Sequence, residues 1–177
     1  AVDYTDGPAV IRYPRGSGSK LEYKNDIQPL EIGTSRTLTS GNKLAILSIG
    51  QIGIEVQKAI SNNQQEGNVT HVDARFMKPL DLQKIGELFR SFDKIITVEE
   101  SCLLGGFGQQ IKVLAKDSGY QGTITSLVCQ MYLWSTEKSQ NSEPSMVLMQ
   151  RELVRLFLLF FNYLLLFYRR LIFVSRY

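Results

Sequence analysis

The sequence predicts an α/β fold with a three-layer, mainly parallel sheet, because short apolar runs alternate with amphipathic stretches along residues 43–127. Four apolar runs have the length of buried strands: KLAILSIG (43–50), NVTHVDARF (68–76), KIITVEES (94–101) and GTITSL (122–127). Three stretches with helical spacing separate them: IGIEVQKAISNNQQ (52–65), DLQKIGELFRSF (81–92) and GGFGQQIKVLAKDSG (105–119). This alternation is typical of a parallel sheet with helices on its faces and right-handed crossovers.

Each expected element is bounded by residues that start or stop it. The first strand ends at Gly50, and the helix after it carries apolar residues mostly at helical spacing: Ile54, Val56, Ala59 and Ile60. The second strand is closed by Lys78-Pro79, and Asp81 lies near the start of the second helix, where the helix dipole favours a carboxylate. The third helix opens on the glycine-rich turn GGFG (105–108).

The composition changes at residue 128, so the two parts of the chain are treated separately. All 14 glycines lie before this point, and the remainder ends in the apolar stretch LFLLFFNYLLLFY. Acidic and basic residues balance in 1–127, so the net charge of +3 comes from the tail and gives no case for nucleic-acid binding. Two cysteines are too few for a disulfide framework, which favours a reducing, cytoplasmic setting.

The segment IRYPRGSG (11–18) holds the candidate binding residue, Arg15. Pro14 fixes the backbone before it and Gly16 leaves room for close approach after it. A guanidinium held in this way suits a phosphate, because its fork matches two oxygens. The residues alone leave open the alternative of a surface linker arginine in an ordinary ion pair.

For the other candidate catalytic or binding residues, the sequence favours structural roles. GGFG lacks the GxGxxG spacing of a dinucleotide loop, so its glycines are expected to allow a tight strand-to-helix turn. The paired carboxylates of VEES (98–101) are compatible with acid–base chemistry, but also with a helix cap or an interface contact, which we prefer. His71 is expected to be a packed or surface histidine, and Ser101-Cys102 lacks an accompanying base. We predict no catalytic and no metal-binding residue.

Five strings in 1–127 resemble the end of the 1-deoxy-D-xylulose-5-phosphate synthases of the transketolase superfamily, in family order and spacing: DGPAVIRYPRGSG, LEIGTSRTL, KLAILSIG, HVDARFMKPLD and ITVEESCLLGGFG. The later strings are also similar to the carboxy-terminal domain of 2-oxoacid dehydrogenase β subunits, and RYPRG separates the two families. The resemblance implies a transketolase carboxy-terminal-domain-like fold.

The resemblance also implies what the longer enzyme does. It condenses pyruvate, after loss of CO₂, with glyceraldehyde 3-phosphate, and supplies isoprenoid, thiamine and pyridoxal phosphate synthesis. Thiamine diphosphate and Mg²⁺ are its cofactors, but the residues that bind them lie upstream in the family, so none is expected to bind this fragment. The arginine of PRG binds the aldehyde's phosphate in the family, which assigns that role to Arg15. A cytoplasmic homodimer is implied for the whole enzyme.

We therefore expect four parts in a fragment that is inactive alone. Residues 1–18 end the central pyrimidine-binding domain, 19–42 form a linker, 43–127 form the transketolase carboxy-terminal domain, and 128–177 form an aberrant tail. Two alternatives remain: a non-catalytic assembly and dimerisation module, or a fragment of a dehydrogenase β subunit.

The tail from about residue 128 departs from the family pattern GLPD…EHG…GIDAEGI. Codons that encode VCQMYLWSTEK (128–138), read one base earlier, can encode GLPDVFVEHGK. A single lost base near Leu127 therefore explains the tail, which is then expected to pack poorly on the body. A membrane anchor in LFLLFFNYLLLFY is the competing interpretation, but a spanning helix needs about 20 largely apolar residues, and Asn162 and the pair Arg169-Arg170 interrupt this run.

Overall fold

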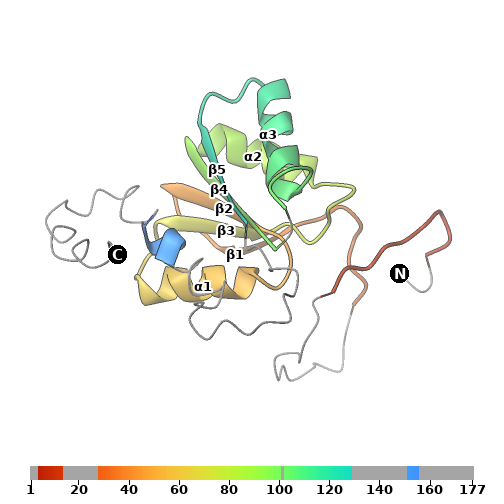
Figure 1. Cartoon of the computed structure of the whole chain (residues 1–177), viewed down its shortest axis with the longest axis horizontal. Helices are drawn as coiled ribbons and strands as arrows, with labels where there is room; N and C mark the ends of the chain where they lie inside the picture. Colours follow the sequence, from red (N-terminus) through yellow and green to blue (C-terminus); the bar gives the residue numbers. More distant parts are fainter. Residues whose placement is uncertain (1–3, 14–27, 101, 129–150, 156–177) are drawn as a thin grey trace, which may run out of the picture.

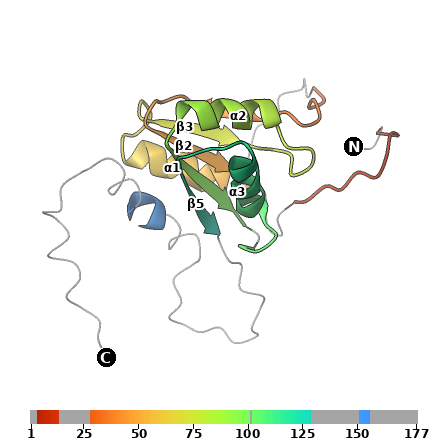
Figure 2. The same ribbon diagram turned by 90° about the horizontal axis from the view of Figure 1, so that it is seen from above.

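The computed structural model describes residues 4–13, 28–100, 102–128 and 151–155. Its elements follow the order β1 (Arg36–Thr39), β2 (Leu44–Ser48), α1 (Gly53–Asn62), β3 (Val69–Asp73), α2 (Leu82–Ser91), β4 (Lys94–Glu99), α3 (Phe107–Asp117) and β5 (Thr123–Val128). The five strands form one sheet in the order β1-β3-β2-β4-β5, with α1 on one face and α2 and α3 on the other (Figures 1 and 2). The predicted three-layer α/β fold is confirmed.

The four strands expected from the sequence are all present and parallel. β2 lies in the middle, paired with β3 on one side and β4 on the other, so that Ile46 stands opposite both His71 and Ile96. β4 continues the sheet to β5, which reaches Val128, one residue past the expected end of the strand. The run LAILS in β2 is buried throughout and apolar except for Ser48, because helices cover both faces of the sheet.

An additional edge strand, β1, was not predicted. It pairs antiparallel with β3, with Arg36 opposite Asp73 and Thr37 opposite Val72. Its four residues, RTLT, are exposed or only partly buried, so they lack the apolar run that marks the central strands. β1 lies inside the stretch 19–42 expected to be a linker, so these four residues belong to the sheet. The other domain boundaries stay predictions.

Each face of the sheet has its own apolar core. On the α1 side, Leu44, Ile46 and Val98 of the sheet pack with Ile52, Val56 and Ile60. On the opposite side, the sheet packs against α2 and α3 through a second set of buried residues: Ala45, Leu47, Val72, Ile85, Leu88, Ile95, Phe107 and Ile111. Of the apolar positions expected on the first helix, Val56, Ala59 and Ile60 join α1 to the sheet, whereas Ile54 is exposed.

Residues 151–155 contradict the expectation that the tail packs poorly on the body. They are helical, and the side chain of Leu153 is fully buried in the core on the α1 side. Leu127 of β5 is only partly buried against the same core, so α1 alone leaves apolar surface there for another side chain to cover. For these five residues the expectation is wrong; the rest of 129–177 lies outside the described residues.

None of the helices in the described part of the chain is long and apolar enough to cross a membrane. The stretch LFLLFFNYLLLFY, which prompted the membrane-anchor alternative, begins at residue 156 and lies outside the described residues.

Candidate functional site

The chemically interesting motifs gather where the parallel strands end. β2 and β4 are neighbours, but the connection from β2 runs through α1 on one face and the connection into β4 comes from α2 on the other. In open α/β sheets, ligands commonly bind at such a switch in connection, outside the carboxyl ends of the strands. Gly50 follows β2 with a φ of +87°, and a methyl group added to it would lie 3.8 Å from the Glu100 carboxylate.

Glu99 is committed to the start of α3. Its side chain is 2% exposed, and its two carboxylate oxygens accept hydrogen bonds from the backbone N–H groups of Phe107 (2.9 Å) and Gly108 (2.8 Å). These are amide groups that a helix leaves unpaired at its amino end, where a negative charge is also favoured by the helix dipole. The expected structural role of VEES as a helix cap is therefore confirmed for Glu99.

The GGFG glycines bring α3 close to the sheet. A Cβ at Gly106 would overlap the Cys102 carbonyl oxygen and lie 2.5 Å from the Glu99 carboxylate. One at Gly108 would lie 2.5 Å from the Ser126 hydroxyl and 2.6 Å from the Thr97 hydroxyl. Because only glycine fits at these two positions, the motif serves close strand-to-helix packing, as predicted, and is not arranged as a phosphate loop.

His71 is a packed histidine in the middle of β3. It is fully buried, and its Nε2 lies 2.8 Å from the Ser48 hydroxyl, while Nδ1 has no partner among the described residues. Burial lowers the pKa of His71 from 6.5 to about 4. A ring enclosed in this way has no access to a substrate, so the pair with Ser48 stabilises the sheet and does not supply a nucleophile and base.

Stability is expected to depend on pH through His71. Its folded pKa is depressed, so the unfolded chain binds more protons between pH 6.5 and 4, and stability falls as the pH drops through that window. From pH 8 to pH 5 the loss due to His71 is about 2 kcal/mol. Urea unfolding at both pH values measures it; His71→Gln should reduce the pH dependence by that amount, and an unchanged difference would contradict the assignment.

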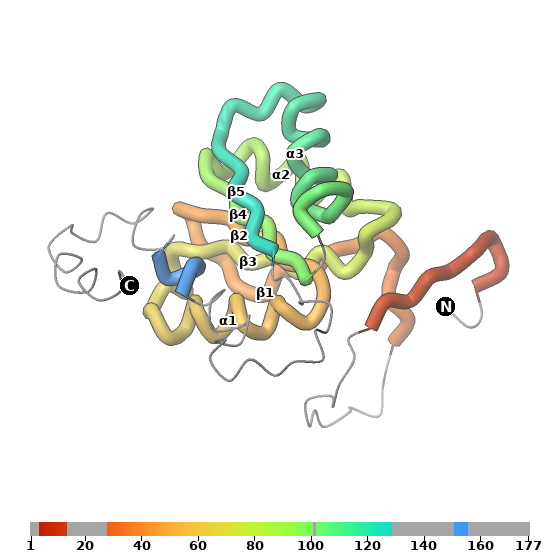
Figure 3. The backbone as a smooth tube through the Cα atoms, in the orientation of Figure 1, coloured from red at the N-terminus to blue at the C-terminus, as the bar shows by residue number. Residues whose placement is uncertain are grey.

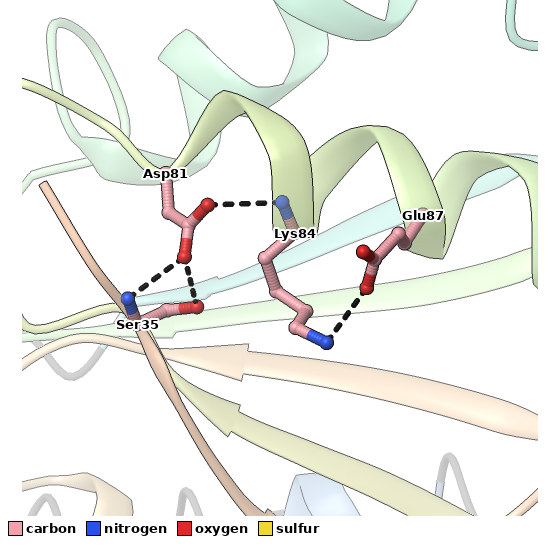
Figure 4. A network of polar contacts seen from close by, with 4 residues as sticks. All are labelled: Ser35, Asp81, Lys84 and Glu87. Atoms are coloured by element: carbon pink, nitrogen blue, oxygen red, sulfur yellow. Dashed lines mark hydrogen bonds and ion pairs between the residues drawn. The ribbon is translucent and has the colours of Figure 1, made fainter.

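Asp81 forms hydrogen bonds with Ser35 and Lys84, and we call these contacts the Asp81 clamp (Figure 4). They hold the segment before β1 against the start of α2. One carboxylate oxygen accepts from Lys84 N (2.9 Å) and caps α2, while the other accepts from Ser35 N (2.8 Å) and the Ser35 hydroxyl (2.7 Å). Burial alone raises the pKa of Asp81, but these hydrogen bonds outweigh it and lower the pKa. A Cβ added to Gly33 would lie 3.1 Å from Cγ of Pro79. The segments KPLD (78–81) and IGTSR (32–36) therefore pack against each other.

Removing the clamp is expected to destabilise the domain. Asp81→Ala loses the cap and both contacts with Ser35, at a cost of about 1–3 kcal/mol. Asp81→Asn should lose less, because one side-chain oxygen can still accept from the helix. Thermal or urea unfolding measures both, with Glu87→Ala as the control: it removes only the solvent-screened pair with Lys84 (2.7 Å) and should change stability little. Equal losses from the two alanine variants would be evidence against the clamp.

Arg15, the predicted phosphate-binding residue, lies outside the described residues. Its neighbour in the motif, Arg12, is described, and its Nη2 donates to the Glu100 carbonyl oxygen at 3.4 Å. This contact brings the segment 4–13 to the carboxyl end of β4. Cys102 is exposed and its Sγ–H donates to the Leu104 carbonyl oxygen (2.9 Å).

Residues 33–144 match the family described as the carboxy-terminal domain of transketolase. The chain belongs to this family. The fold comparison agrees: a solved structure titled split gene transketolase, inactive beta4 tetramer, has a TM-score of 0.58 and 19% identity over 76% of this chain and 45% of its own. At that identity the likeness shows the fold alone.

Comparison with curated relatives shows which members of the superfamily the chain is similar to. The 1-deoxy-D-xylulose-5-phosphate synthase of Phocaeicola vulgatus is 41% identical over 120 residues, 67% of this chain and 19% of the relative. The synthase of Parabacteroides distasonis is 43% identical over 116 residues (65% and 18%), and that of Bacillus mycoides is 37% identical over 125 residues (70% and 20%). The chain thus spans about a fifth of their length, and the resemblance to these synthases is confirmed.

Proposed function

We propose that this transketolase carboxy-terminal domain is part of a 1-deoxy-D-xylulose-5-phosphate synthase, which joins pyruvate, after loss of CO₂, to glyceraldehyde 3-phosphate. The observation that supports the proposal is identity of about 40% to synthases of that name over two thirds of the chain. Most of the length of such an enzyme lies outside this chain, so the domain acts together with the remainder of the synthase in a cytoplasmic homodimer.

We propose that the thiamine diphosphate and Mg²⁺ of the synthase bind in the remainder of the enzyme. In the ranges 4–13, 28–100, 102–128 and 151–155, no three His, Cys, Asp or Glu side chains gather in a way that could hold a metal ion. The one buried carboxylate at the strand ends, Glu99, is used by the start of α3. We therefore assign cofactor binding, and the chemical steps that use the cofactor, to the remainder of the synthase.

Within that enzyme we assign Arg15 to the phosphate of glyceraldehyde 3-phosphate. Arg12, three residues earlier, contacts the carboxyl end of β4, which supports a position for the RYPRG motif beside the domain edge where α/β folds place their sites. The segment then contributes one charged group to a substrate site completed by the preceding domains.

The purified chain is expected to show no synthase activity. Pyruvate, glyceraldehyde 3-phosphate, thiamine diphosphate and Mg²⁺ would be incubated with it, and product measured by mass spectrometry against a no-protein control. Because we assign the cofactor-binding residues to the remainder of the synthase, product should stay at the control level. Product above the control, from a preparation free of host synthase, would refute the fragment proposal.

We also propose that one lost base near the codons for Leu127 and Val128 produced the tail. The out-of-frame string GLPDVFVEHGK supports this proposal, since Met131 and Trp134 have one codon each and so fix part of it. Resequencing the junction tests the proposal directly. An extra base there would restore the family pattern, whereas an intact reading frame through the tail would contradict the proposal.

A further inference from the structure

Exposed apolar side chains gather at one edge of the domain. We call it the carboxyl edge: the end of the sheet where β2, β3, β4 and β5 finish and α1, α2 and α3 begin. Of the exposed large apolar residues described between 28 and 128, all but Val113 belong to segments at this edge: Leu30, Ile32, Ile54, Leu82, Leu103 and Leu104. Leu30 and Ile32 are placed there because their segment enters β1 opposite the end of β3.

The opposite edge is polar. The turns there connect α1 to β3 and α3 to β5, and they read NNQQEGN (62–68) and SGYQG (118–122). The aromatic side chain in the second turn, Tyr120, stacks on Phe89 and donates its hydroxyl hydrogen to the Phe92 carbonyl oxygen (2.8 Å). The difference between the edges therefore marks the carboxyl edge as the surface suited to bury apolar groups.

Leu103 and Leu104 are held outward by a well-anchored loop. Their side chains are 54% and 82% exposed. The loop between β4 and α3 is fixed after them by Gly105, whose N–H donates to the Gln109 side chain, and by the contacts of Glu99 with the first turn of α3. Two adjacent leucines presented to solvent from such a loop are typical of a contact surface.

The chain itself indicates what covers this edge. Segment 4–13 reaches it through the contact of Arg12 with the Glu100 carbonyl oxygen, and lies on the side from which α1 starts (Figure 3). That segment also exposes Val10, Ile11 and Tyr13, at 93%, 66% and 81%. The curated relatives contain about four fifths of their length beyond the matched part, which is apolar and polar surface available to cover this edge.

We propose that the carboxyl edge, with Leu103 and Leu104 as its anchors, is the surface on which the remainder of the synthase packs. This inference rests on the proposed function. The opposite, polar edge and the outer face of α3 around Val113 stay exposed to solvent in the complete enzyme.

Hydrogen–deuterium exchange tests the surface. It compares the purified 177-residue chain with a hybrid synthase, the Phocaeicola vulgatus enzyme in which residues 4–128 replace the matching segment. Amides of 102–106 and 50–54 should exchange at least about tenfold more slowly in the hybrid, while 118–122 exchange equally in both. Protection confined to 118–122, or no difference anywhere, would overturn the proposal. Concentration-dependent protection of 102–106 in the chain alone would overturn it in favour of a second copy as the occupant.

A pair of matched variants separates contact from folding. Leu104→Asp should leave the melting temperature of the chain unchanged but lower that of the hybrid and remove the added protection at 102–106. Val113→Asp, which also replaces an exposed apolar residue (52% exposed, against 82% for Leu104), should change neither protein. Equal effects of the two variants in the hybrid would overturn the proposal.

Synthase activity of the hybrid is read separately. An active hybrid without protection at 102–106 rejects the surface alone, whereas a folded, protected but inactive hybrid rejects the proposed function alone.

Discussion

Glu99→Ala is expected to destabilise the domain by about 3–5 kcal/mol, because it removes two charge-assisted hydrogen bonds to buried amide groups, each worth about 1.5–3 kcal/mol. Both lost bonds belong to the first turn of α3, at Phe107 and Gly108, and the vacated space lies in a tightly packed part of the fold. Such a loss is a large fraction of the stability of a small domain. Urea unfolding of the chain, followed by circular dichroism, measures it.

Glu100→Ala is the matched control, since in the described part of the chain it is the backbone carbonyl oxygen of Glu100 that accepts from Arg12. It should cost less than about 0.5 kcal/mol, as do most substitutions on the surface. Glu99→Gln should fall between the two, because one amide oxygen can still accept a hydrogen bond. If Glu100→Ala destabilised the domain as much as Glu99→Ala, the helix-cap account of the VEES motif would be wrong.

Arg15→Ala, introduced into the hybrid synthase, is expected to raise the KM for glyceraldehyde 3-phosphate far more than the KM for pyruvate. Only the aldehyde carries a phosphate dianion, and a guanidinium contact to it is worth about 1.5–3 kcal/mol. That corresponds to roughly 10- to 150-fold in apparent affinity. Steady-state kinetics with each substrate varied in turn gives the two values.

Two further variants make the Arg15 result specific. Arg15→Lys should recover part of the affinity, because an ammonium keeps the charge but lacks the bidentate fork. Arg12→Ala should have a smaller effect that does not distinguish the two substrates, since Arg12 contacts the protein backbone at Glu100. Equal impairment of both substrates by Arg15→Ala would favour an ordinary surface arginine instead.

The sequence predicts the parallel core well because its signals are local. The predominantly apolar runs of β2 and β4 are buried on both faces of the sheet. The second and third glycines of GGFG fit where a Cβ would overlap neighbouring atoms. The structural role that we preferred for Glu99 over acid–base chemistry is also confirmed, because its side chain caps α3.

Features that depend on distant pairs could not be read from the sequence. β1 lacks an apolar run, and it pairs with β3 next to the contact between Ser35 and Asp81, which are 46 residues apart. Leu153 likewise enters the core from a segment whose composition marks it as foreign to the body. The contact of Arg12 with Glu100 joins residues 88 apart, and no local spacing signals it.

Synthase activity of the hybrid tests the central claim most directly: that residues 4–128 are the closing part of a 1-deoxy-D-xylulose-5-phosphate synthase. With pyruvate, glyceraldehyde 3-phosphate, thiamine diphosphate and Mg²⁺, the hybrid should form product at a kcat/KM within about tenfold of the parent enzyme, a difference of less than about 1.4 kcal/mol in transition-state stabilisation. A hybrid that is folded and carries bound thiamine diphosphate but forms no product would contradict the account.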